Sequence, residues 1–283
     1  MNRDYALEIS GWLFKTGKIK DEWFVDLEKP ELFIEYIKNM NKKPDIFTFW
    51  QRMPNVEPKY NYLMEKESIA VLKLSTYDHW WQKQLNSKTR NVIRKSFKSG
   101  VEVKKDAFND NFVQGIVNIF NETPVRQGRP FWHYQKPFEK VKEEMSDRLD
   151  ISEFIGAYWN GELIGFIKLL YLKEYTMMVE IISRISHRDK SPNNALISKA
   201  VEICCENNVK YLIYSKWLEG TLGDFKKHNG FIKVELPRYY VPITLIGRYS
   251  IILKLHHGIK GIFPEKALDY LKYLRKIWYK KYI

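Results

Sequence analysis

Residues 121–135, NETPVRQGRPFWHYQ, gather side chains that can bind and react within a short stretch of the chain. Arg126 and Arg129 can each hold a phosphate or a carboxylate through two hydrogen bonds, because a guanidinium presents paired donors. Trp132 and Tyr134 can stack on the face of a sugar or a base. These four residues are therefore predicted to bind a substrate.

The same segment offers two proton acceptors. His133 is an imidazole whose ordinary pKa lies near neutral pH, and Glu122 supplies a carboxylate. Both are predicted to be catalytic, since either can take a proton from a reacting group. The structural alternative is a loop whose aromatic rings anchor it to the core while its arginines face water.

The segment 121–135 is flanked by predicted helices. Apolar residues with helical spacing predict a helix over 109–123, and a second helix is predicted over 136–147. A short strand is predicted over 101–106, ahead of the first helix. The cluster of reactive side chains therefore lies in a connection between two helices, where a loop can be positioned by a rigid scaffold.

Strands and helices alternate after this connection. Asn160-Gly161 is typical of a two-residue hairpin turn between strands. The predicted elements are strands over 153–159, 162–172 and 175–183, a helix over 193–207, a strand over 209–215, a helix over 221–229 and a strand over 231–236. An antiparallel half followed by a parallel crossover is typical of a mixed α/β (α+β) fold, with a central mixed sheet flanked by helices. The crossover helix can part the strands on either side of it and open a cleft above their ends.

The first hundred residues are predicted to hold mixed structure. A strand is predicted over 45–52, and a pair of strands over 60–75 joined at Glu65–Ser68. A long helix with a basic face follows over 77–98, and Gly100 ends it. The predicted domains are an α/β region at 1–99, a core at 100–245, and a C-terminal strand with a basic amphipathic helix at 246–283.

The composition favours a folded protein with an anionic partner. Hydrophobic residues make up 45% of the chain and aromatic residues 15%, which argues against extensive disorder. The formal net charge of +13 favours nucleic acid, a phosphorylated cofactor or an anionic membrane surface. A lysine-rich surface without such a partner is the alternative, because the lysines are spread along the chain.

Cysteine and histidine spacing predicts no metal site. The two cysteines, Cys204 and Cys205, are adjacent, and the six histidines show no ligand spacing with them. The N-terminus lacks an apolar signal core and no run of 18 apolar residues occurs, so a cytoplasmic location is predicted. A peripheral position at the inner face of the membrane, through the basic helix predicted over 264–283, is the alternative to packing of that helix on the domain.

Three stretches resemble acyltransferases of the GNAT superfamily. They are SKTRNVIRKSFKSGVEV (87–103), SHRDKSPNNALISKAVEICCENNVKYLIY (186–214) and LGDFKKHNGF (222–231). The local sequence is similar to the branch that contains FemAB-type aminoacyltransferases and acetyltransferases of bacterial cell-envelope glycan pathways. The resemblance spans residues 101 to about 240 and implies a GNAT-like fold, with 1–99 as a reduced copy of it.

The resemblance implies a donor site in the second stretch. The residues that would bind the phosphates of the donor, acyl-CoA in GNAT proteins, are Arg188, Lys190, Ser191 and Asn194. Ser191 and Asn193 stand where the family has glycines, and Pro192 lacks the backbone N–H that such a loop aims at phosphate. FemAB-type proteins, which take the acyl group from aminoacyl-tRNA, also lack the glycine-rich loop, so both donors stay open.

The third stretch implies a role for Lys226. Many GNAT proteins have a tyrosine at this place that protonates the leaving thiolate, and FemAB-type proteins have a lysine thought to steady developing negative charge. Lys226 is therefore a candidate for that role, with an exposed helix face as the alternative. Tyr214 and Trp217, near the end of the strand predicted over 209–215, are predicted to line the cleft, with core packing as the alternative.

Three functions are compatible with these residues. The first is an N-acyltransferase that moves an acetyl or similar group from acyl-CoA to an amine, carried by a sugar or a lipid-linked cell-envelope precursor, by direct attack in a ternary complex. No Ser-His-Asp or Cys-His arrangement points to a covalent intermediate. The second is a FemAB-like aminoacyltransferase that uses aminoacyl-tRNA. The third is a non-catalytic basic module that binds nucleic acid or membrane through 83–98 and 264–283.

Overall fold

The computed structural model describes residues 5–257 and residue 270. The described chain forms two compact units. We call Ser68–Val234 the central unit. The described residues up to Glu67 and from Glu235 onward make up the terminal unit.

The boundaries of these units differ from the predicted domain boundaries. Helix α3 (Ser87–Lys98), which the sequence assigns to the end of the N-terminal region, contributes its buried Ile93 to the core of the central unit. The ranges 1–99, 100–245 and 246–283 therefore do not coincide with the two units.

A mixed sheet forms the middle of the central unit, in the strand order β4-β11-β10-β9-β8-β5. The strands are β4 (Leu63–Lys73), β5 (Glu102–Asp106), β8 (Ser152–Trp159), β9 (Glu162–Tyr171), β10 (Thr176–Ser183) and β11 (Tyr211–Lys216). Neighbouring strands are antiparallel, except β10 and β11, which are parallel. The predicted mixed α/β class is confirmed.

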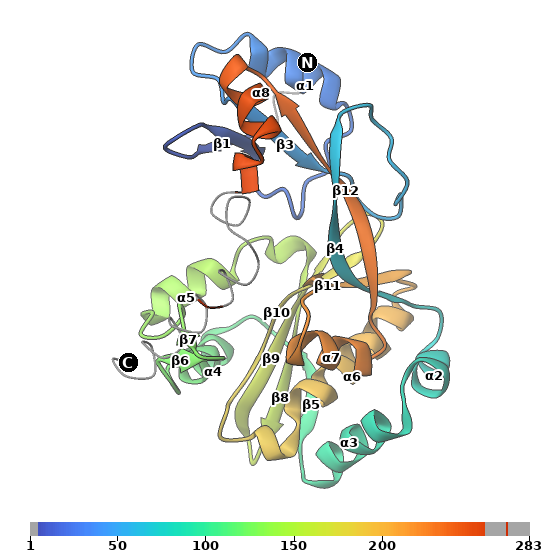
Figure 1. Cartoon of the computed structure of the whole chain (residues 1–283). Coiled ribbons are helices and arrows are strands. Elements are labelled where there is room, and N and C mark those ends of the chain that lie inside the picture. The colour runs from blue at the N-terminus through green and yellow to red at the C-terminus, as the bar shows by residue number, and fades with distance from the viewer. Residues whose placement is uncertain (1–4, 258–269, 271–283) are drawn as a thin grey trace. The chain divides into compact units, whose positions relative to one another are not determined.

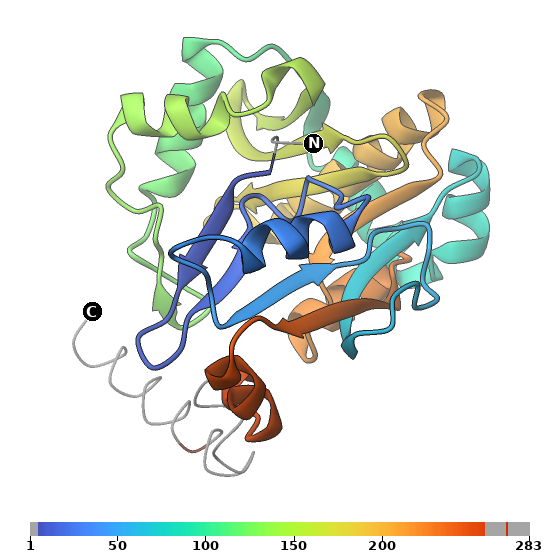
Figure 2. The same cartoon turned by 90° about the horizontal axis from the view of Figure 1, so that it is seen from above.

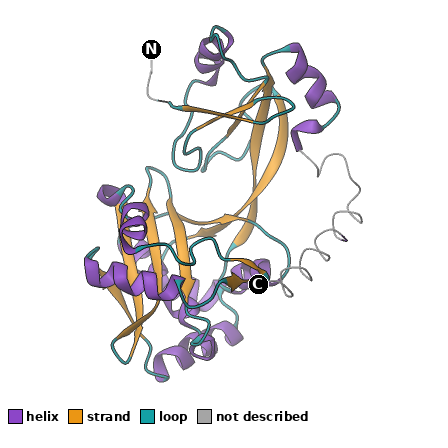
Figure 3. Cartoon of the chain, turned by 90° about the vertical axis from the view of Figure 1, so that its left-hand side faces the viewer, coloured by secondary structure: helices purple, strands orange, loops and turns teal. Residues whose placement is uncertain are grey.

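Helices cover both faces of this sheet (Figures 1 and 3). Besides α3, they are α4 (Asp110–Phe120), α5 (Phe138–Met145), α6 (Pro192–Glu206) and α7 (Thr221–His228). Figure 1 shows α4 and α5 on one side of β8–β10, with α6 and α7 on the other. Because successive strand residues point to opposite faces, Phe154 joins the core under α4 and α5, whereas Ile155 joins the core under α6.

The predicted hairpin between β8 and β9 is confirmed. Trp159 pairs with Glu162, and the turn residues Asn160 and Gly161 have φ angles of 51° and 79°. A two-residue turn with positive φ at both positions matches the twist of the flanking strands, and asparagine and glycine tolerate that conformation better than other residues.

The strand pair predicted over 60–75 is wrong, because β4 runs through the expected turn as a single strand. The charged residues that suggest a turn have ion-pair partners at their strand positions. Lys66 lies 3.2 Å from Glu235, and Glu67 lies 2.9 Å from Arg238. A run of charged residues can therefore continue a strand when oppositely charged side chains face it.

The single helix predicted over 77–98 is also wrong. A short α2 (Tyr77–His79) continues into a π-helical segment, Trp80–Gln84, and Leu85 is extended with φ −87° and ψ 139°. The side chain of Asn86 then caps α3 by accepting a hydrogen bond from the Thr89 N–H over 2.7 Å. A side-chain cap of this kind starts a new helix, so the sequence contains two helices where one was expected.

The terminal unit contains a smaller sheet in the order β1-β2-β3-β12. Its elements are β1 (Leu7–Ser10), β2 (Thr16–Ile19), α1 (Pro30–Lys38), β3 (Ile46–Trp50) and β12 (Ile232–Pro242). Helix α1 packs on this sheet (Figure 2), and its Phe33 shares a core with Phe47 and Tyr239. The strand predicted over 45–52 is confirmed as β3, and the strand predicted over 231–236 continues to Pro242.

The C-terminal strand predicted within 246–283 is not found in the described residues. Helix α8 (Leu245–Ile252) stands there instead, capped by the Thr244 hydroxyl, which accepts a hydrogen bond from the Gly247 N–H over 3.2 Å. The helix predicted over 264–283 lies outside the described residues apart from Tyr270. Among the helices that the structure describes, none has the length and apolar composition needed to cross a bilayer.

Candidate functional site

Residues 121–135 contain a small hairpin in the central unit. β6 (Val125–Arg126) pairs with β7 (Arg129–Pro130), and the turn residues Gln127 and Gly128 have positive φ angles of 53° and 71°. The pairing sets Arg126 directly opposite Arg129. The predicted binding segment is therefore shaped by backbone hydrogen bonds.

Arg126 uses its guanidinium inside the central unit. One Nη donates to the carbonyl oxygen of Ser183 over 2.8 Å, and the other to that of Ile119 over 3.1 Å. Its guanidinium also lies 4.7 Å from the centre of the Phe131 ring. Burial lowers the pKa of Arg126, although the carboxylate of Glu122 opposes that effect. These contacts favour a role in joining α4, the hairpin and the end of β10.

Glu122 forms hydrogen bonds with residues 185–186, which follow the end of β10. Its carboxylate accepts hydrogen bonds from the N–H groups of Ile185 (2.5 Å) and Ser186 (2.8 Å), and from the Ser186 hydroxyl (2.6 Å). Burial raises the pKa of Glu122, but the hydrogen bonds from Ser186 and Ile185 and the charge of Arg126 outweigh it, so the pKa lies below its ordinary value. A carboxylate with a lowered pKa is a poor proton acceptor near neutral pH.

His133 is buried between aromatic rings. Its side chain is 2% exposed and stacks on Phe120 with the ring centres 4.0 Å apart. Burial lowers the pKa of His133 to about 3, and the charges of Lys136 and Arg126 act in the same direction. The imidazole is therefore neutral near pH 7 and a weak base. Its Nε2 lies 3.7 Å from Oε1 of Glu180.

Glu180 is a candidate that sequence reasoning missed. It follows a bulge in β10, where the pairing with β9 shifts between Met178 and Glu180. Burial raises the pKa of Glu180 to about 7, against the opposing charges of Lys136 and Lys168. A carboxyl group with a pKa near the working pH is suited to take up and release protons. The available signal was a single glutamate inside the apolar strand pattern TMMVEIIS.

Two lysines near Glu180 are satisfied by other partners. Lys136 Nζ lies 2.7 Å from the carboxylate of Glu144. The buried Lys168 donates to the carbonyl oxygens of Met145 (2.9 Å) and Asp147 (2.6 Å), and burial lowers its pKa. Among the described residues, neither lysine lies within 4.0 Å of the Glu180 carboxylate, and burial keeps the pKa of this carboxyl group raised despite their charges.

Three aromatic or basic residues of 121–135 face outward. Trp132 is 67% exposed and its ring lies beside that of His133. The Lys136 ammonium lies over the Trp132 ring, 3.8 Å from the ring centre. Arg129 is exposed and Tyr134 is partly exposed. These three of the four predicted binding residues remain accessible to a substrate, whereas Arg126 is held by the protein.

The parallel strands β10 and β11 are paired over a short distance. Thr176 pairs with Leu212 and Met177 with Ile213, whereas β10 continues to Ser183 and β11 to Lys216. Ser215, in the unpaired part of β11, has a φ of 54°. Glu180 lies three residues beyond Met177, the last residue of β10 that pairs with β11, and is itself paired with Lys168 of β9. The predicted parting of strands on either side of the crossover helix is therefore present in the hydrogen-bond pattern.

Lys226 is buried at the end of β11. Its side chain reaches from α7 and donates to the carbonyl oxygens of Tyr214 (2.7 Å) and Lys216 (2.6 Å), on either side of Ser215. Burial lowers the pKa of Lys226 to about 8. The predicted exposed helix face is wrong for Lys226, since 1% of the residue is exposed.

The turn before α6 differs from a phosphate-binding loop in its hydrogen bonds. The N–H groups of Arg188, Lys190, Ser191 and Asn194 donate to backbone carbonyls within residues 185–191, and Pro192 has no N–H. Ser191 adopts the left-handed conformation with φ 52°, where a glycine would be unstrained. Most of the backbone N–H groups that would bind a pyrophosphate here are therefore already hydrogen-bonded within the turn.

Tyr214 and Trp217 both contact the core. Tyr214 packs edge-on against Phe231 with ring centres 5.7 Å apart, and burial raises the pKa of its phenol, with the charge of Glu180 adding to the rise. Trp217 is partly buried, and its backbone N–H donates to the Ser68 carbonyl oxygen over 2.8 Å. The electrostatic effect of Glu180 on Tyr214 indicates that both lie near the place where β10 and β11 part.

No known protein-family model matches the sequence, and no curated protein matches it. Solved structures are similar over most of the chain. FemX is 10% identical with a TM-score of 0.59, over 89% of each chain. The C-terminal domain (DUF2156) assigned to a lysylphosphatidylglycerol synthetase from Agrobacterium fabrum is 10% identical with a TM-score of 0.60, over 88% of this chain and 83% of that domain.

The fold is GNAT-like. A tandem GNAT protein from the clavulanic acid biosynthesis pathway is 10% identical with a TM-score of 0.50, over 85% of this chain and 79% of that one. The similarity to this protein and to FemX confirms the predicted GNAT-like fold.

Proposed function

We propose that this protein transfers an acyl or aminoacyl group to an amine by direct attack, with Glu180 as the general base. The observation that carries this proposal is the position of Glu180, a carboxyl group with a side chain 17% exposed and a pKa of about 7, three residues beyond the last residue pair of β10 and β11. The GNAT-like fold supports it, and the exposed Trp132, Tyr134 and Arg129 offer a surface for the acceptor.

The reaction balances with the groups that the protein supplies. The acceptor enters as an ammonium ion and gives one proton to the ionised carboxylate of Glu180. The free amine attacks the carbonyl carbon of the donor, the new carbon–nitrogen bond forms, and the bond to the leaving oxygen or sulfur breaks. The leaving group takes up one proton, so the products are an amide and a free hydroxyl or thiol.

The preferred donor is aminoacyl-tRNA. In the turn before α6, most backbone N–H groups bond inside the turn and Pro192 lacks one, which disfavours the pyrophosphate of coenzyme A. The net charge of +13 suits a polyanion with many phosphates. The names of similar structures, FemX and a lysylphosphatidylglycerol synthetase, fit an aminoacyl donor.

Acyl-CoA is the second candidate donor. Arg188 and Lys190 lie at the N-terminal end of α6, where their positive charge favours a phosphate. The similar tandem GNAT protein, whose structure was determined without acetyl-CoA, points the same way. The acceptor proposed with either donor is an amine on a sugar or a cell-envelope precursor.

A ligand screen with the full chain distinguishes the donors. We expect total tRNA to raise the melting temperature at low salt, because a ligand that binds only the native state stabilises it, and we expect coenzyme A and acetyl-CoA to leave it unchanged. Transfer is then measured as loss of a labelled amino acid from aminoacyl-tRNA in the presence of amino sugars.

The variant Arg188→Ala provides the matched test of the turn. We expect it to weaken donor binding, whereas Lys173→Ala, which removes an exposed charge in the β9–β10 connection, should not. A melting temperature raised by acetyl-CoA and unaffected by tRNA would make acyl-CoA the donor. Binding of tRNA without release of amino acid to any amine would favour the non-catalytic nucleic-acid-binding module instead.

A further inference from the structure

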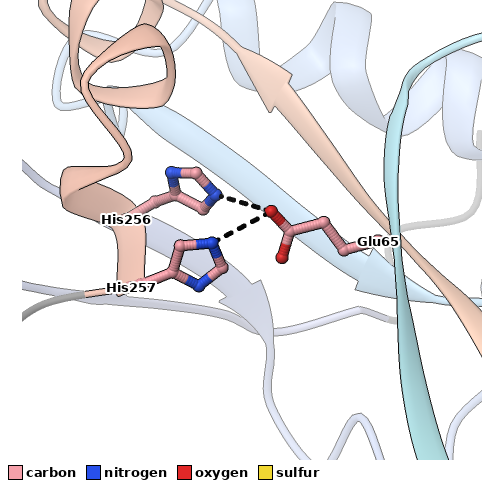
Figure 4. A group of neighbouring side chains, drawn as sticks. All are labelled: Glu65, His256 and His257. Atoms are coloured by element: carbon pink, nitrogen blue, oxygen red, sulfur yellow. Dashed lines mark hydrogen bonds and ion pairs between the residues drawn. The ribbon is translucent and has the colours of Figure 1, made fainter. Parts of the chain in front are cut away.

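Three potential metal ligands meet in the terminal unit, and none of them belongs to the candidate site. Glu65 lies on β4, and His256 and His257 lie in the short 3-10 turn that follows α8. Figure 4 shows both imidazoles pointing at one carboxylate oxygen. Nε2 of His256 lies 3.1 Å, and Nε2 of His257 3.0 Å, from Oε1 of Glu65.

The cluster is enclosed on one side and accessible on the other. The His256 side chain is 3% exposed and packs edge-on against Tyr240, with ring centres 4.8 Å apart. The side chains of Glu65 and His257 are each 33% exposed. The buried imidazole fixes the position of the group, while the other two leave access for an ion and a water molecule.

The local charge favours a cation. Carboxylates of Glu65, Glu67 and Glu22 and the guanidinium of Arg238 all act on Tyr240, the ring that packs on His256. Arg238 is already shared between Glu22 and Glu67, at 2.9 Å from each. Glu65 has no such basic partner among the described residues, apart from the two histidines.

We propose that Glu65, His256 and His257 bind a divalent transition-metal ion, with Zn²⁺ as the best match. Two imidazole nitrogens and one carboxylate oxygen are a common set of zinc ligands, with bonds of about 2.0–2.2 Å. Ligand atoms around a tetrahedral ion with such bonds are about 3.3 Å apart. The observed separations of 3.0 and 3.1 Å from oxygen to nitrogen need little change to admit the ion.

The ion would fasten the turn after α8 to β4. Two adjacent histidines and a glutamate 191 positions before the first of them close a long loop of chain. Sequence spacing could not reveal this site, because the ligands come from distant segments and resemble no known motif. Three protein ligands leave a fourth position that a water molecule can fill.

Metal binding by the full chain tests this site. After treatment with a chelator, we expect one Zn²⁺ per chain in a calorimetric titration. Glu65→Gln and His257→Ala should each weaken binding at least about 10-fold, the lower end of what loss of even a supporting residue costs a metal site. His228→Ala, which removes an exposed histidine of the central unit, should bind Zn²⁺ as the wild type does.

Cobalt substitution identifies the ligands directly. Co²⁺ bound by nitrogen and oxygen should give visible d–d bands without the thiolate-to-metal charge-transfer band that a cysteine ligand adds. Zn²⁺ binding that is unchanged in both Glu65→Gln and His257→Ala would overturn the proposal. Binding that disappears in Cys205→Ser would assign the metal to the thiol and overturn it as well.

Discussion

Glu180 and His133 show how one buried environment treats an acid and a base in opposite ways. Burial raises the pKa of Glu180 to about 7 and lowers that of His133 to about 3. Around pH 6 both side chains are therefore mostly uncharged, with Nε2 and Oε1 3.7 Å apart. Near neutral pH the carboxylate is the stronger base by roughly four pKa units.

We expect Glu180→Gln to lower kcat/KM by about 10²–10⁴-fold, the usual contribution of a general base. In the wild type, kcat/KM should rise with pH through about 7, because the carboxyl group must be ionised before it can accept a proton. The variant should lack this rise. The measurement is a pH profile of transfer with the donor that binds.

Stability provides a second measurement for Glu180. Because the native state holds this proton more tightly than the unfolded chain, the free energy of unfolding falls as pH rises from 4.5 to about 7. Glu180→Gln should remove that fall, whereas Glu174→Gln, an exposed residue, should keep it. An activity profile unchanged by Glu180→Gln would exclude the residue as the base, whatever its effect on stability.

The structure gives Glu122 and Arg126 partners that their residue types alone did not predict. The stretch 121–135 contacts Glu180 through His133. The charged groups of Glu122 and Arg126, however, form hydrogen bonds with backbone groups of the protein itself. Sequence shows which groups a side chain offers and not which partners the fold provides. Glu180 was missed as a candidate because it lies outside this stretch, in a strand whose pattern is apolar.

At the scale of structural elements, the end of β11 is bound by Lys226, a side chain of helix α7. Its end departs from regular strand geometry at Ser215, and the ammonium of Lys226 binds the carbonyl oxygens on both sides of that residue. Lys216 also pairs with Ile69 of β4, beyond the register shift that contains Ser215. Lys226 therefore adds a side-chain donor to an irregular strand end.

Lys226→Met should lower the free energy of unfolding by about 2 kcal/mol, since two hydrogen bonds from a charged donor to partly buried carbonyl oxygens are lost. In the wild type, stability should rise between pH 8 and 10.5, because the unfolded chain holds the lysine proton more tightly than the native state. The variant should lack that rise. Urea unfolding at pH 7.5 and pH 10 measures both effects.

Lys227→Met is the matched control for Lys226, because it changes an exposed neighbour in the same helix. It should alter stability by less than about 0.5 kcal/mol. If Lys226→Met abolished transfer while leaving stability and its pH dependence unchanged, the lysine would act on the leaving group, as the resemblance to FemAB-type proteins implies.

Element order in the central unit was largely predictable, because its strands and helices carry strong periodicity and a clear Asn-Gly turn. The predictions failed where a local interaction overrides periodicity. Asn86 starts a new helix inside an apparently continuous one, and ion pairs carry β4 through a charged stretch. Strands β1 and β2 were missed because they are only four residues each and weakly patterned.

For the whole molecule, the excess of positive charge is concentrated on at least one element. Helix α3 contains five basic residues and no acidic one. Lys88, Lys95 and Lys98 are exposed, and none of them has an ion pair among the described residues. A helix of this composition is suited to follow a phosphate backbone.

Replacing Lys88, Lys95 and Lys98 together by glutamine should weaken tRNA binding and reduce its salt dependence. The slope of log affinity against log salt should fall by about 1 for each phosphate contact that is lost. The same change at Lys38, Lys42 and Lys43 of the terminal unit removes equal charge and should have a smaller effect. Equal slopes in the two variants would mean that total charge, and not α3, determines binding.

Trp132 gives the molecule a natural optical reporter. Its indole is exposed to solvent on one side, while an ammonium and an imidazole touch it on the other. Indole fluorescence responds to nearby charge and to water, so any compound that settles on this ring should change its colour and brightness. The chain has nine tryptophans, so the change in fluorescence that disappears in Trp132→Phe reports occupancy of the proposed acceptor surface, without a label.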